Sequence, residues 1–306
     1  PTFFLPRMVE AAAQSLDCRL ESVDGNGLMP MRATETVYPT AYAFRRYLQK
    51  SLVPHLAEFP LRAPLHELPP RPAPVASEVR DRWPEASDAL LTASPAALAG
   101  LPIDHSVPPS PVLRGGAVPA LDRLAQFLDH GLAKYHEERS QPDADAASGL
   151  SPWLHFGHLG AHRVFNAIVT QAGWTTRRIA SKASGTREGW WGAPPAVEAF
   201  LDELITWREV GFNFAALRAD HDQYGSLPDW ARASLEAHAT DRREHLYTLE
   251  AFDRAETHDA VWNAAQRQIV REGRMHNYLR MLWGKKVLEW SARPEDAFES
   301  LVGLNN

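Results

Sequence analysis

Residues 275–290 read MHNYLRMLWGKKVLEW, and this stretch decides how the second half of the chain folds. Its residues favour a helix throughout, apart from Gly284, which costs about 1 kcal/mol in a helix interior. Spacings of three and four place five residues on one helix face: Asn277, Arg280, Met281, Gly284 and Leu288. Trp283 and Trp290 are seven residues apart, so they lie on nearly one line, about 10 Å apart along the axis. From this pattern alone, surface polar residues and core tryptophans are the favoured interpretation.

Helical periodicity extends back from this stretch to residue 120, and convincing β alternation is absent. The second half is therefore predicted to be all-α. Besides the periodic run at 120–135, the expected helices are His162–Gln171, Ala196–Ala216, Trp230–Ala239, Tyr247–Ala255, Asp259–Glu272 and Met275–Trp290.

The first 62 residues have a different organisation. An amphipathic helix is expected at Arg7–Leu16, a strand at Arg19–Val23, a turn at Asp24–Gly27 and a second helix at Ala41–Leu56. The order of helix, strand, turn and helix is typical of part of an α/β layer.

Proline separates these two regions. Residues 54–120 contain 14 of the 24 prolines, which predicts an extended connector with short helices, one of them within Ser87–Ala99. We expect three parts: a partial α/β domain at 1–62, a proline-rich linker at 63–118 and a helical domain at 119–306.

Composition excludes several classes of protein. With 32 basic and 38 acidic residues the formal charge is −6, so any contact with nucleic acid must come from a local patch. The single Cys18 excludes a disulfide framework and suits a reducing compartment. No HExxH motif occurs, so no metal site is expected. No apolar run approaches 18 residues, so we expect a cytoplasmic protein without a membrane partner.

Two further segments could carry chemistry. Glu203 and Trp207 lie four residues apart on a predicted helix, where a carboxyl and an indole suit a planar ligand. The loop Ser148–Ser151 precedes a helix near Pro152, with Ser151 as its expected N-cap, and helix starts of this kind bind phosphate. Each pattern is more often structural than functional.

Segments distributed along nearly the whole chain match one protein family, and they occur in the same order as in that family. They include VDGNGLMPMRA, YPTAYAFRRYLQKSL, SGLSPWLHFG, SGTREGWWG, FLDELITWRE, REHLYTLE, VWNAAQRQ and MHNYLRMLWGKKVLEW. In these segments the chain resembles the photolyase/cryptochrome family, most closely the class II cyclobutane pyrimidine dimer photolyases.

The resemblance implies a mainly α fold, with an all-helical FAD-binding domain preceded by a partial, Rossmann-like α/β domain. It implies a deoxyribodipyrimidine photo-lyase, which splits pyrimidine dimers in UV-damaged DNA by electron transfer from photoexcited reduced FAD. No obligate protein partner is implied, and a full-length parent has room for an antenna chromophore.

The resemblance also implies roles for individual residues. Those expected to hold FAD are Tyr135, Ser148, Gly149, Leu150, Ser151, Arg208 and Arg280, with Asn305 near flavin N5. Those expected to hold the dimer or DNA are Arg139, Glu203, Trp207, Asn277 and Met281. Those expected to pass electrons to the flavin are Trp283, Trp262 and Trp290.

The chain departs from the family pattern at three places. Ser140 stands where class II members usually have asparagine. The sequence begins partway into the α/β domain and stops before a loop that closes over the flavin, so we expect a poor enzyme from this chain alone. A cryptochrome-like photoreceptor, a non-catalytic flavin-binding relative and a helical scaffold without a cofactor remain the alternatives.

Overall fold

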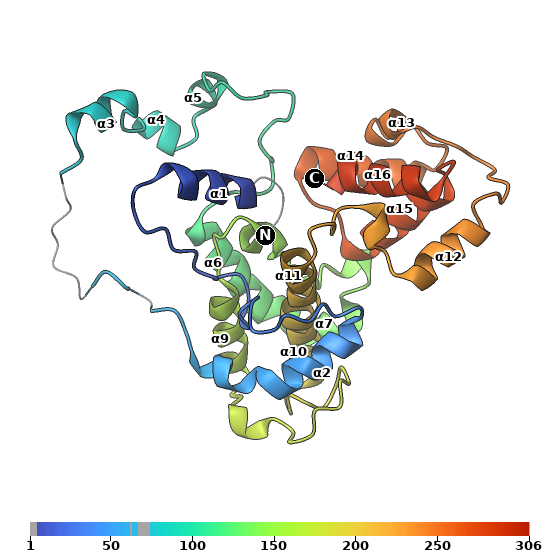
Figure 1. The fold of residues 1–306 in the computed structure, drawn as a ribbon, viewed down its shortest axis with the longest axis horizontal. Helices are drawn as coiled ribbons and strands as arrows, with labels where there is room; N and C mark the ends of the chain where they lie inside the picture. The colour runs from blue at the N-terminus through green and yellow to red at the C-terminus, as the bar shows by residue number, and fades with distance from the viewer. Residues whose placement is uncertain (1–4, 62, 67–73, 306) are drawn as a thin grey trace. The chain divides into compact units, whose positions relative to one another are not determined.

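The computed structural model describes residues 5–61, 63–66 and 74–305, and the chain divides into two units. The larger unit joins Pro1–Phe59 to Leu113–Asn306, and the smaller unit is Pro60–Val112. Every regular element in the described ranges is helical, which confirms the mainly α fold class (Figure 1). The predicted limits of the three domains stay a prediction.

The larger unit contains these elements in chain order: α1 (Leu5–Ser15), α2 (Ala41–Ser51), η1 (Val53–Ala57), α6 (Ala117–Gln126), η2 (Phe127–Gly131), η3 (Leu132–Lys134), α7 (Tyr135–Glu138), η4 (Pro142–Ala144), α8 (Ser151–His155), α9 (Ala161–Gln171), η5 (Thr176–Arg178), α10 (Pro195–Leu201), η6 (Asp202–Trp207), α11 (Arg208–Leu217), η7 (Tyr224–Ser226), α12 (Asp229–Ala237), α13 (Leu249–Asp253), α14 (Ala260–Glu272), α15 (Asn277–Glu289) and α16 (Pro294–Asn305). The smaller unit contains α3 (Ser77–Arg82), α4 (Asp88–Leu91) and α5 (Pro95–Ala99). Of the η elements, η2 and η6 are π-helical and the others are 3₁₀ helices.

One apolar core lies around α10. Helices α7 and α9 pack against α10, and α2 packs against η6, which continues α10. The side chains of Phe127, Phe165 and Leu201 are almost completely buried there. Because α2 places Phe44 and Leu48 in this same core, α2 packs as part of the helical unit.

A second, smaller core lies in the C-terminal helices. Its buried members are Phe252, Trp262, Trp283, Val287 and Trp290, from α13 to α15 and the residue that ends α15. Helix α16 packs on α15, as the orange and red ribbons show in Figure 1. Sequence analysis did not predict α16.

The predicted strand at Arg19–Val23 is wrong. These residues are exposed and form no regular element, since a strand is stable only when a neighbouring strand pairs with its backbone. The bend after them does form: the Asp24 carboxylate accepts hydrogen bonds from the amides of Asn26 (3.2 Å) and Met31 (2.6 Å). In the described ranges, no helix has the length and apolar character needed to cross a membrane.

Candidate active site

A π-helical turn interrupts the long helix that carries Glu203 and Trp207. The sequence predicts one helix over Ala196–Ala216, and the chain is helical from Pro195 to Leu217. Between α10 and α11, however, residues Asp202–Trp207 form the π-helical element η6. A π-helix bonds each amide to the carbonyl five residues earlier, so the spacing expected for a regular α-helix is wrong here. Such turns inside α-helices occur frequently at functional sites.

Glu203 forms an ion pair with Arg139, which lies at the end of α7. The guanidinium nitrogen of Arg139 is 2.5 Å from a Glu203 carboxylate oxygen, and both side chains keep partial contact with solvent. Sequence analysis assigned both residues to one site, and the structure brings them together. The pair leaves part of each polar group accessible to a ligand.

Tyr135 completes this group from the buried side. The Arg139 guanidinium lies 5.4 Å from the centre of the Tyr135 ring, whose edge packs against Phe127 and Phe200. Burial raises the pKa of Tyr135, although its hydrogen bond to Arg139 acts in the opposite direction. Burial also lowers the pKa of Arg139, but hydrogen bonds to Glu203 and Tyr135 outweigh it and leave that pKa raised. Arg139 is therefore a permanent cation.

Trp207, Met281 and Asn277 expose their side chains. Trp207 ends η6 and is 49% exposed, and Met281 in α15 is 51% exposed. Asn277 is the exposed first residue of α15. In the described ranges no polar contact joins Asn277 or Met281 to the Arg139–Glu203 pair.

Three buried tryptophans form a continuous series of ring contacts. The rings of Trp283 and Trp262 are parallel within 5°, with centroids 5.9 Å apart, and the ring of Trp290 lies 6.0 Å from Trp262. Trp262 donates its indole N–H to the Trp283 carbonyl at 3.1 Å, and Trp283 donates to the Gln266 side chain at 3.0 Å. The series thus runs Trp283, Trp262, Trp290, with α14 supplying the middle ring.

Sequence analysis missed two residues at the outer end of this series. Tyr247 and His258 lie with their ring centroids 5.8 and 4.9 Å from that of Trp290. The Tyr247 hydroxyl and His258 Nδ1 are 2.8 Å apart. Both residues precede α14, and no local pattern in the sequence relates them to Trp290.

The chain is similar to curated DNA photolyases. It is 38% identical over 208 residues to the deoxyribodipyrimidine photo-lyase of Potorous tridactylus, covering 68% of this chain and 36% of that one. It is 32% identical over 304 residues to the enzyme of that name from Methanothermobacter thermautotrophicus, covering 97% of this chain and 58% of the relative.

The chain belongs to the photolyase/cryptochrome family. It spans between 36% and 58% of the lengths of these two relatives. No protein-family profile matches it. Among solved structures, a bacterial class III photolyase from Agrobacterium tumefaciens aligns with a TM-score of 0.49 and 19% identity, over 92% of this chain and 54% of that one.

The loop at Ser148–Ser151 suits a phosphate group of a photolyase cofactor. Arg123 holds the loop by donating to the carbonyls of Ser148 (2.8 Å) and Ala147 (2.9 Å). Gly149 has a φ of +64°, a conformation that favours glycine. The backbone amides of Gly149 and Ser151 have no hydrogen-bond partner in the described ranges, so they remain free to bind an anion.

The expectation that Ser151 caps the following helix is wrong. Ser151 is the first residue of α8, and the N-cap position belongs to Leu150, whose buried side chain offers no hydrogen bond. Ser148 instead accepts a weak hydrogen bond from the Leu150 amide at 3.4 Å. At either position the Ser151 amide is among the first N–H groups of the helix, which have no acceptor within it.

The other three residues expected near the flavin lie outside this loop. Arg208 in α11 donates to the Asn26 carbonyl and stacks 4.6 Å from the Phe212 ring, and burial lowers its pKa. Arg280 in α15 is exposed and forms no ion pair in the described ranges. Asn305 in α16 donates its side-chain amide to the Leu301 carbonyl at 2.8 Å. In the described part of the chain no polar contact links these three residues to one another.

In the described ranges, no group of three or more His, Cys, Asp and Glu side chains is placed to hold a metal ion.

Proposed function

We propose that this chain carries out light-dependent DNA repair as a photolyase of class II type, splitting cyclobutane pyrimidine dimers with FAD as cofactor. The observation that carries this proposal is the series Trp283, Trp262 and Trp290, with ring centroids 5.9 and 6.0 Å apart inside a buried cluster. Stacked and edge-packed indoles stabilise a core by their burial and ring contacts. They also provide neighbouring aromatic rings along which an electron can move.

The loop residues Ser148, Gly149, Leu150 and Ser151 would hold the diphosphate of FAD. Free amides at a positive-φ turn suit an anion, and Arg123 keeps the turn in place. Reduced FAD, when bound, supplies the electron that opens the cyclobutane ring. Tyr135, Arg208, Arg280 and Asn305 are proposed as further contacts to the same cofactor.

Glu203, Arg139 and Trp207 distinguish repair from light sensing. Arg139 holds the Glu203 side chain at 2.5 Å and leaves part of it accessible to accept a hydrogen bond from a pyrimidine. The half-exposed indole of Trp207 offers an apolar face to the flipped dimer. Asn277 and Met281 are proposed at the DNA-facing side. A photoreceptor has no need of a carboxylate and an indole arranged to bind a lesion.

The experiment uses the 306-residue chain, reconstituted with FAD and photoreduced or chemically reduced. We expect a flavin absorption spectrum after removal of free FAD. We also expect slow loss of thymine dimers from an oligonucleotide under blue light and none in the dark, in line with the poor activity expected of this chain alone. Flavin binding without repair would support the photoreceptor alternative, and a colourless protein would contradict the proposal. As a DNA-repair enzyme, this protein would act inside the cell.

A further inference from the structure

A buried ion pair lies directly beside Glu203 in the sequence. Arg45 in α2 binds the Asp202 carboxylate through two parallel contacts, Nε to Oδ1 at 2.7 Å and a terminal nitrogen to Oδ2 at 3.0 Å. The exposed fractions of these side chains are 8% and 4%. Arg187, which is 57% exposed, adds a looser contact at 3.5 Å. The bidentate contact from Arg45 is therefore the stronger of the two interactions that Asp202 makes with arginines.

Stability alone does not explain this pair. Removing two charges from water costs about as much free energy as their attraction returns, so apolar residues of similar size often serve equally well. Uncharged groups also connect α2 to the neighbouring loop. Gln49 accepts a hydrogen bond from the Gly185 amide at 2.7 Å and donates one to the Thr186 carbonyl at 3.0 Å. The Arg45–Asp202 pair is better explained by the residues that it orients.

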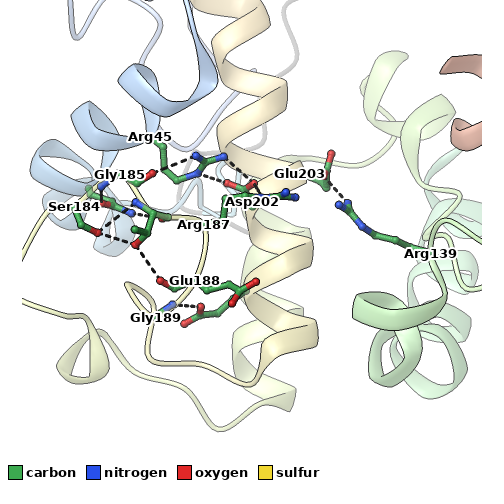
Figure 2. A network of polar contacts seen from close by, with 12 residues as sticks. Arg45, Arg139, Ser184, Gly185, Arg187, Glu188, Gly189, Asp202 and Glu203 are labelled. Atoms are coloured by element: carbon green, nitrogen blue, oxygen red, sulfur yellow. Dashed lines mark hydrogen bonds and ion pairs between the residues drawn. The ribbon is translucent and has the colours of Figure 1, made fainter.

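Asp202 and Glu203 are consecutive residues, and two arginines hold them from opposite sides. Figure 2 shows Asp202 directed toward Arg45 and Glu203 directed toward Arg139 across the same helix. Buried Leu201, Leu204 and Ile205 already hold this turn in the core, so the ion pairs act on its finer orientation. The two pairs constrain it together, because a small rotation that moves Glu203 also separates Asp202 from Arg45.

The held residues are the first two of the π-helical turn η6. A π-helix is less stable than an α-helix and persists where tertiary contacts support it. The grip of Arg45 acts at its first residue, so it determines where the wider turn begins. The direction of the next side chain, that of Glu203, depends on that starting point.

We propose that Arg45 is a positioning residue for the lesion site, and that its pair with Asp202 sets the direction of the Glu203 carboxylate. The inference rests on the proposed function, in which Glu203 contacts the pyrimidine dimer. It adds a residue of α2, over 150 positions away in the chain, to the determinants of dimer recognition.

The principal variant is the double replacement Arg45→Met with Asp202→Leu, which leaves no unpaired buried charge. We expect thermal unfolding at or above the wild-type temperature, because an apolar pair replaces a desolvated ionic pair. We expect the Kd for an oligonucleotide with one thymine dimer to rise about tenfold, within the range of coupling between neighbouring residues. The Kd for the undamaged oligonucleotide should stay unchanged.

Arg45 also donates to the Gly185 carbonyl at 3.3 Å. Gln49→Ala is the matched control, since it removes two hydrogen bonds from α2 to the same loop at Gly185 and Thr186 without touching Asp202. It should lower stability and leave the preference for the dimer intact. In a Glu203→Gln background the double replacement should not weaken dimer binding further. Where Glu203→Gln itself weakens dimer binding, the inference would be overturned by dimer affinity within twofold of wild type in the double variant, or by an equal further loss in the Glu203→Gln background.

A measurement without DNA separates this inference from the proposed function. The coupling between Arg139 and Glu203 is obtained from a double-mutant cycle on unfolding, with Arg139→Gln and Glu203→Gln. We expect the coupling to disappear when Arg45 and Asp202 are replaced. Coupling that persists overturns the positioning role. If Glu203→Gln leaves dimer binding unchanged while the coupling is lost, the proposed role of Glu203 fails and the positioning of its side chain stands.

Discussion

The indole rings of Trp262 and Trp283 lie parallel within 5° at a centroid separation of 5.9 Å, although 21 residues separate them in the chain. The hydrogen bond from the Trp262 N–H to the Trp283 carbonyl fixes this arrangement across two helices. Trp283 and Trp290 share α15 and its end, but the ring contacts between them pass through Trp262. Trp262, from the neighbouring helix α14, therefore occupies the middle of the tryptophan series.

Replacing Trp283 or Trp262 with phenylalanine should abolish or strongly reduce photoreduction of bound oxidised flavin, because each breaks the series. Repair by chemically reduced protein should remain largely intact. Transient absorption under blue light measures the first effect. The matched control is Trp174→Phe: Trp174 is equally buried and donates its N–H to the Trp191 carbonyl, yet lies outside the series. Unchanged photoreduction in both series variants would contradict the electron path.

Trp207→Ala should weaken binding to dimer-containing DNA by about 5- to 150-fold, since stacking on one base contributes roughly 1–3 kcal/mol. The fold should tolerate the change, because the side chain is 49% exposed. Fluorescence anisotropy with damaged and undamaged oligonucleotides measures the difference. Trp230→Ala, at a 76% exposed position in α12, is the control. Equal loss for both oligonucleotides would indicate a general structural defect.

Glu209 should make the unfolding free energy fall as pH rises from about 4.5 to 7. Burial raises the pKa of Glu209 to about 7, although the amides of Leu28 and Met29 donate to its carboxylate at 2.7 and 3.1 Å. Between these pH values the folded state binds more protons than the unfolded state, so stability is greatest below the unfolded pKa and declines toward the folded one. Urea unfolding from pH 4 to 8 measures this decline.

Glu209→Gln is the control for that pH dependence, since the amide does not titrate. Its unfolding free energy should vary less across the same interval than that of the wild type. A wild-type profile that rises from pH 4.5 to 7 would show that the two amide hydrogen bonds outweigh burial.

Gly192→Ala should destabilise the chain by more than about 1–2 kcal/mol, the cost of a left-handed conformation for an ordinary residue. Gly192 has a φ of +60°, and an added Cβ would lie 2.3 Å from the Arg178 carbonyl oxygen. Gly211→Ala is the opposite case: it is helical, has no neighbour within 4 Å of the added Cβ, and should stabilise by about 0.5–1 kcal/mol. Thermal unfolding compares the two, and equal effects would contradict the role of backbone conformation.

Local pattern was sufficient for most of the helices. The expected helix at Met275–Trp290 is α15 at Asn277–Glu289, and the expected helix at Asp259–Glu272 is α14 at Ala260–Glu272. These elements follow from side-chain spacing, helix propensity and caps within one segment, all of which are readable in the sequence. The resemblance likewise grouped Arg139 with Glu203, which the structure places in contact.

Local pattern failed where the decisive partner is distant. The segment Arg19–Val23 is expected to be a strand, but a strand requires a second segment to pair with it. The π-helical turn at Asp202–Trp207 has no signal of its own, because its sequence is equally compatible with an α-helix. Each outcome depends on contacts made elsewhere in the chain.

The sequence by itself determined that this protein is mainly helical, where most helices begin and end, and which family it resembles. Only the tertiary structure decided that Trp262 lies between Trp283 and Trp290, and that Arg45 holds Asp202 beside Glu203. Helix periodicity states which side chains share a face, whereas the rotation of one helix against another depends on packing among residues far apart in the chain.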